Sequence, residues 1–80
     1  MSKAMIDLTA MSKTIDQWTR TLYGKEVSFS VVEEDDGTFT EWCRIYPDHE
    51  FHQKLIERPT RYAVEQRLER TESFRQLAGI

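Results

Sequence analysis

The sequence predicts an α+β domain: an N-terminal helix, an antiparallel β-hairpin and a C-terminal helix, with one further strand as a candidate member of the sheet. Three patterns predict this class. Apolar residues recur every three or four positions before residue 24, as along one side of a helix. Apolar and polar residues then alternate on both sides of an Asp-Asp-Gly turn. A helical pattern returns after Pro59.

The N-terminal part of the chain predicts an amphipathic helix from about residue 4 to Tyr23. Its apolar stripe starts at Ala4 and continues through Leu8, Met11, Ile15, Trp18 and Leu22. Gly24 follows directly and suits the left-handed position that ends many helices. We expect the stripe to pack against the protein's own sheet. The alternative is a coiled-coil-like contact with a partner helix or with a second copy, which would make a homodimer.

The first ten residues admit two interpretations. The segment MSKAMID at residues 1–7 is echoed by MSKTID at residues 11–16, so Met11 resembles a second start of the chain. The unbroken stripe favours one long helix, whereas the repeated start favours a frayed leader over residues 1–10. In both cases residues 1–80 form a single domain, because a chain of this length has room for only one core.

Two alternating segments, KEVSFSVVE from residue 25 and GTFTEWCRIY from residue 37, predict the strands of the hairpin. The turn at residues 35–37 suits a three-residue loop that ends on a left-handed glycine. This loop pairs Phe29 with Cys43. A two-residue loop would instead place Phe29 opposite Trp42 and bring the tryptophan into the core. The position of the glycine favours the three-residue loop.

The favoured loop places three large side chains side by side on the face opposite the core. They are Trp42, Arg44 and Tyr46, called the aromatic strip below. Trp, Arg and Tyr are the residue types enriched among the residues that dominate protein interfaces. An acidic tip lies at the end of the same hairpin and consists of Glu33, Glu34, Asp35 and Asp36. The sequence therefore predicts a partly exposed binding strip beside a negatively charged turn.

The segment at residues 50–56 fits either a third strand or a short helix. A strand is favoured, because two strands alone form a marginal sheet. The last helix is predicted to begin at an N-cap on Thr60 and to end at Gly79, with a break near Glu72 if Ser73 and Gln76 form a second capping box. Its inward residues are expected to be Ala63, Val64, Leu68, Phe74 and Leu77.

Charge and composition narrow the classes of function. The net charge is −3, and residues 33–50 alone carry −6. The C-terminal arginines are interleaved with glutamates, as on a solvated helix face, so the charge pattern does not favour nucleic acid as a partner. Cys43 is the single cysteine and calls for no oxidising compartment. The chain has no apolar run long enough to span a membrane, so we expect no membrane association and a cytoplasmic location.

The sequence contains no recognisable motif for catalysis or metal binding. The acidic tip lacks the ligand spacing of an EF-hand loop. His49 and His52 could share a face only in a helix, where Cys43 or Asp48 would complete a set of three zinc ligands. Solvent-exposed histidines after a strand are the favoured interpretation. A nucleophilic cysteine needs an exposed, activated thiolate, whereas Cys43 falls on the core side of its strand. We expect no metal, no cofactor and no enzymatic activity.

These patterns predict a small acidic protein-binding module, such as an adaptor, an inhibitor or an accessory subunit. The aromatic strip and the acidic tip would engage a partner protein that carries a basic surface. Phage- or plasmid-encoded inhibitors supply an analogy for compact acidic proteins of this kind. The alternative is a nucleic-acid-binding regulator that uses the C-terminal arginines on phosphates and the aromatic residues for stacking.

Overall fold

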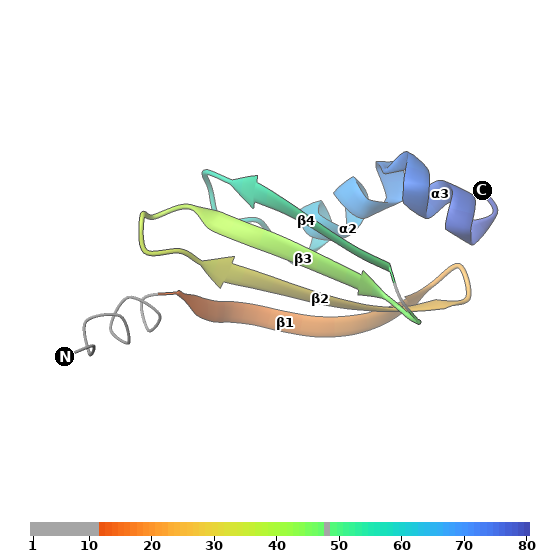
Figure 1. Cartoon of the computed structure of the whole chain (residues 1–80), viewed down its shortest axis with the longest axis horizontal. Coiled ribbons are helices and arrows are strands. Elements are labelled where there is room, and N and C mark those ends of the chain that lie inside the picture. The colour runs from red at the N-terminus through yellow and green to blue at the C-terminus, as the bar shows by residue number, and fades with distance from the viewer. Residues whose placement is uncertain (1–11, 48) are drawn as a thin grey trace.

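The computed structural model describes residues 12–47 and 49–80. Four antiparallel strands form one sheet in the order β1-β2-β3-β4, and two helices follow them in the chain. The strands are β1 (Lys13–Leu22), β2 (Lys25–Glu33), β3 (Phe39–Ile45) and β4 (His49–Leu55), and the helices are α2 (Arg61–Arg70) and α3 (Glu72–Ala78). Both helices lie on the same side of the sheet (Figure 1). The α+β class is confirmed, with a layout that differs at the N-terminal end.

The predicted N-terminal helix is wrong over residues 13–22, which form strand β1. Two residues four positions apart share a face in a strand as well as in a helix, so Trp18 and Leu22 fit both structures. Ile15 fits as well, because a bulge between Thr14 and Asp16 inserts one residue and Ile15 packs against the core. The β-branched and aromatic residues of this segment favour a strand. Leu8 and Met11, with the rest of residues 1–11, lie outside the described residues.

Gly24 ends a strand and not a helix. Leu22 pairs with Lys25, so Tyr23 and Gly24 form a two-residue hairpin loop. Both loop residues have a positive φ, 50° for Tyr23 and 78° for Gly24, which is the signature of a type I′ turn. A glycine at such a position serves a hairpin and a helix end equally well.

The hairpin of β2 and β3 has the predicted register. The backbone N–H of Glu34 donates to the carbonyl of Thr38 at 2.9 Å, which closes the three-residue loop, and Gly37 has a φ of 88°. Phe29 therefore pairs with Cys43, and Trp42 pairs with Ser30. The register prediction is confirmed.

The remaining elements settle the alternatives that the sequence left open. Residues 49–55 form a strand and not a helix. The hydroxyl of Thr60 accepts a hydrogen bond from the backbone N–H of Ala63 at 3.1 Å, as predicted for the N-cap. The helical segment breaks at Thr71, one residue from the predicted position, and Thr71 takes the cap position expected for Ser73. Gly79 ends α3 with a φ of 77°.

The core lies between the sheet and the helices. Its buried residues are Leu22, Val27, Phe29, Val31, Cys43 and Ile45 from the sheet, and Val64, Leu68 and Phe74 from the helices. Trp18 stacks on Phe29 from the neighbouring strand, with a ring-centroid distance of 5.0 Å. Because side chains alternate along a strand, the opposite face of the sheet carries the even-numbered residues of β2, β3 and β4. No described helix or strand covers that face.

Candidate functional site

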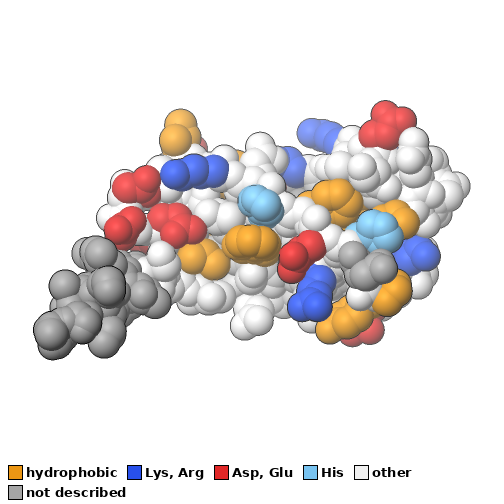
Figure 2. Space-filling view, viewed as in Figure 1, with side chains coloured by type: hydrophobic (Ala, Val, Ile, Leu, Met, Phe, Trp, Pro, Cys, Tyr) orange, Lys and Arg blue, Asp and Glu red, His pale blue; other side chains and the backbone are white. Residues whose placement is uncertain are grey.

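The candidate site is the face of the sheet that points away from α2 and α3, called the open face below. Figure 2 views this face and shows hydrophobic and histidine side chains near its middle, with acidic side chains at the hairpin end. The open face carries Gln17 and Thr19 of β1, Ser28, Ser30 and Val32 of β2, Thr40, Trp42 and Arg44 of β3, and Glu50, His52 and Lys54 of β4.

The aromatic strip lies on the open face, as the register predicted. Trp42 is half-buried, and its indole packs against the imidazole of His52 on β4 at a ring-centroid distance of 4.7 Å. The guanidinium of Arg44 lies 5.7 Å from the ring centroid of Tyr46, within range of a cation–π contact. Tyr46 itself is 50% exposed. These contacts hold the three side chains in defined positions without the help of a helix.

A shallow groove of about 400 Å³ lies beside the aromatic strip. It exists because Ser28 and Ser30 are small, whereas their partners on β3, Arg44 and Trp42, are large. Its lining includes Gln17, Ser28, Ser30, Val32, Trp42, Arg44, Tyr46 and Glu50. The groove combines an indole face with hydroxyl, amide and charged groups, which suits the contact surface of a partner protein.

The four acids of the tip do not act as one group. Glu34 accepts hydrogen bonds from the hydroxyls of Thr40 at 2.7 Å and Ser12 at 2.9 Å. Asp36 accepts from the backbone N–H and the hydroxyl of Thr38, which lower the pKa of its carboxyl, and Lys54 lies 3.5 Å away. Asp35 is exposed at the loop. Glu33 falls on the helix side of the sheet, opposite Phe39. Two of the four carboxylates therefore hold the turn.

Sequence reasoning missed a set of arginine–carboxylate pairs between α2 and the sheet. Arg61 binds Asp16 at 2.7 Å, and this hydrogen bond holds the pKa of Asp16 below its usual value. Arg20 of β1 binds Glu65 of α2 at 2.8 Å, and the indole N–H of Trp18 donates to the same carboxylate. The residues of these two pairs are 45 positions apart in the chain, so no local spacing reveals the pairs.

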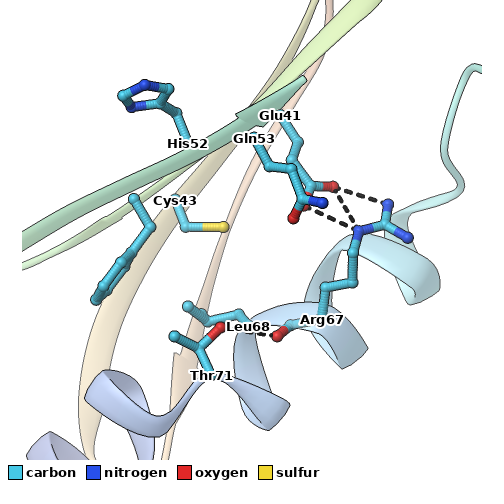
Figure 3. A pocket seen from close by; sticks show the side chains of 8 residues that line it. Glu41, Cys43, His52, Gln53, Arg67, Leu68 and Thr71 are labelled. Carbon is cyan, nitrogen blue, oxygen red and sulfur yellow. Dashed lines mark hydrogen bonds and ion pairs between the residues drawn. The ribbon is translucent and has the colours of Figure 1, made fainter. Parts of the chain in front are cut away.

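The third pair borders a cavity of about 230 Å³ between β3, β4 and the helices (Figure 3). Arg67 donates through Nε and Nη2 to the carboxylate of Glu41, which is only 4% exposed. The Cys43 thiol points into this cavity. Burial raises the pKa of that thiol to about 12, and the Glu41 charge adds to the shift while Arg67 opposes it. The thiol therefore stays protonated at neutral pH and is not a nucleophile.

The histidines are not brought together. In strand β4, His49 and His52 are three positions apart and fall on opposite faces, because alternation along a strand separates odd from even positions. Within residues 12–47 and 49–80, no three His, Cys, Asp or Glu side chains are close enough to hold a metal ion. Neither helix of this part is long and apolar enough to cross a membrane.

Comparison with known proteins adds no relative. The chain matches no protein-family model, no curated protein and no solved structure.

Proposed function

We propose that this protein is a non-catalytic binding module of the cytoplasm that engages another protein through the open face. It would act as an adaptor, an inhibitor or an accessory subunit. The observation that carries the proposal is the position of Trp42. This half-buried indole stands in the middle of a sheet face that no described element covers, beside a groove and next to Arg44.

An uncovered tryptophan is an effective anchor for a partner. The indole offers a large apolar surface, and its packing against His52 fixes its position before binding. Truncation of such a residue to alanine at the centre of an interface typically weakens binding by about 2–4 kcal/mol. Arg44 and Tyr46 extend the same surface along β3, so a partner could contact all three members of the strip at once.

The charges favour a protein partner over nucleic acid. Two arginines that a nucleic-acid-binding regulator would use, Arg61 and Arg67, are bonded to Asp16 and Glu41 in ion pairs. Phosphate binding there would require breaking those pairs. The tip adds negative charge at one end of the open face, where the exposed Asp35 would attract a basic patch on a partner.

The test compares the full-length wild type with two variants, in each of which one aromatic side chain is replaced by alanine. Trp42→Ala changes the open face, and Tyr62→Ala is the matched control, because Tyr62 is 73% exposed on α2. The wild type and each variant are immobilised and exposed to lysate of the source cells, with and without nuclease treatment, and the amount of bound protein is measured. We expect Trp42→Ala to weaken capture at least about thirtyfold and Tyr62→Ala to leave it unchanged. Equal capture by both variants would contradict the proposal. Capture that disappears after nuclease treatment would favour the nucleic-acid alternative.

A further inference from the structure

Strand β4 forms one edge of the sheet. In the described part of the chain its only strand neighbour is β3, with which it pairs over seven residues, from His49 to Leu55, without a break in register. An edge strand carries unpaired backbone N–H and C=O groups, which can pair with another strand. Only every second residue of β4 directs these groups outward, because successive residues of a strand bond in opposite directions.

The hydrogen bonds of the neighbouring hairpin determine which residues of β4 direct their backbone groups outward. Tyr46 donates its backbone N–H to the carbonyl of Glu26, so the even-numbered residues of β3 bond toward β2. In an antiparallel sheet successive residues bond in opposite directions, so the odd-numbered residues of β3 bond toward β4. Their partners in β4 are also odd-numbered. The backbone groups of Glu50, His52 and Lys54 therefore point to the free edge.

The other edge of the sheet is less suited to pairing. Strand β1 contains the bulge between Thr14 and Asp16, which distorts an edge and hinders the addition of a strand. Strand β4 has no bulge. Its helix-side residues Phe51 and Leu55 are only half-buried, so the helix layer does not enclose this edge.

The three outward residues are complementary to themselves. Glu50 and Lys54 lie on the same face, each two positions from His52. When two copies of an antiparallel strand meet about a twofold axis at His52, Glu50 of each copy lies opposite Lys54 of the other. Opposite charges directly across a strand pair are favourable, and like charges are unfavourable.

We propose that the protein forms a homodimer by antiparallel pairing of β4 with β4 of a second copy, centred on His52. Each of the three outward residues on each strand would donate one backbone N–H to the other strand, so about six main-chain hydrogen bonds would form. The ion pairs between Glu50 and Lys54 would set the register. This interface differs from the helix contact that the sequence suggested for a homodimer.

The present contacts of these side chains leave room for the pairing. Lys54 lies 3.5 Å from Asp36, and both side chains are more than half exposed, so this ion pair is weak. Glu50 is exposed beside Arg44. The twofold axis would run perpendicular to the sheet, so one continuous eight-stranded sheet would present both open faces, with both copies of Trp42, on the same side. The dimer does not depend on the proposed function, because its test measures mass and not partner binding.

The first test uses charge reversal in the full chain. Sedimentation and light scattering from about 5 to about 500 μM follow the shift from the monomer mass of 9.5 kDa to twice that value. We expect Glu50→Lys and Lys54→Glu each to weaken association at least tenfold, because each places like charges opposite one another. The double variant should recover at least half of the loss, measured as the logarithm of the association constant. A wild-type monomer at about 500 μM, or a double variant as weak as the single ones, would overturn the proposal.

The second test uses proline at the two edges. His52→Pro removes an outward N–H and leaves the bonds between β3 and β4 in place, so the fold should tolerate it. Thr19→Pro is the matched control, because the same alternation directs the backbone of Thr19 to the free edge of β1. We expect His52→Pro to be monomeric and Thr19→Pro to remain dimeric. The reverse result would place the interface on β1 and overturn the proposal. If either proline variant unfolds, the charge reversals decide.

Discussion

Arg67 of α2 donates two hydrogen bonds to the carboxylate of Glu41 on β3, at 2.9 Å from Nε and 2.8 Å from Nη2. Glu41 faces the helices from the same side of the sheet as Cys43 and Ile45, and only 4% of its surface is exposed. A buried carboxylate is costly unless a partner neutralises it and satisfies its oxygens. The pair therefore fixes α2 against the sheet at one position.

Replacing Arg67 alone should lower the free energy of unfolding more than replacing both Arg67 and Glu41. Arg67→Met leaves Glu41 charged and unpaired, and we expect a loss of about 2–4 kcal/mol in the free energy of unfolding, less than for a fully buried pair because Arg67 is 35% exposed. The double variant Glu41→Leu/Arg67→Met should recover at least half of this loss. Urea denaturation of the wild type, Arg67→Met, Glu41→Leu and the double variant measures the coupling. Additive losses would show that the two side chains do not act as a pair.

The pair of Asp16 and Arg61 should make stability depend on acid pH. Arg61 lowers the pKa of Asp16 in the folded protein below its ordinary value of 3.8. The contribution of this carboxylate is therefore complete above about pH 4 and is lost as the pH falls through the folded pKa. Asp16→Asn should lower the melting temperature at pH 7, and its difference from the wild type should shrink as the pH falls below about 4. Arg61→Gln should show the same pH dependence on top of a constant loss, because it also removes the contact with the Trp18 ring at every pH. A difference between wild type and Asp16→Asn that stays constant across this range would contradict the assignment.

How much of this fold follows from the sequence depends on the range of the interactions. The hairpin register was predictable, because an Asp-Asp-Gly turn fixes which residues of β2 and β3 face one another. Thr60 and Gly79 marked the ends of the last helical segment for the same local reason. Strand β1 was missed, because its bulge imitates the apolar spacing of a helix. The aromatic strip was predictable from the register, whereas the ion pairs of α2 join distant residues and leave no local pattern.

The Cys43 thiol should be unreactive in the folded protein. Burial raises its pKa to about 12, so almost no thiolate exists at pH 8. We expect a thiol reagent such as iodoacetamide to label the folded protein at pH 8 at least a hundredfold more slowly than the urea-unfolded protein. Mass spectrometry at timed intervals measures both rates. Equal rates in the two states would show that the cavity beside Cys43 admits the reagent and that the thiol is not held in its protonated form.

Truncation of the two tryptophans should destabilise the protein by different amounts, because they lie on opposite faces of the sheet. Trp18 stacks on Phe29, its indole N–H donates to Glu65 at 2.9 Å, and the guanidinium of Arg61 lies 4.8 Å from its ring centroid. Trp18→Ala removes all three contacts and should lower the free energy of unfolding by about 2–4 kcal/mol. Trp42 lies half-buried on the open face, where its indole contacts the imidazole of His52, so Trp42→Ala should cost about 1 kcal/mol or less.

Thermal unfolding of the two variants checks this contrast, since about 1 kcal/mol shifts the melting temperature of a domain of this size by about 4–8 °C. Trp18→Phe is a suitable control, because it keeps an aromatic ring that can stack on Phe29 but cannot donate the hydrogen bond to Glu65. Its stability should fall between those of the wild type and Trp18→Ala. A Trp42→Ala protein that melts as early as Trp18→Ala would mean that the indole supports the fold. In that case the open face would lose the anchor on which the proposed partner binding depends.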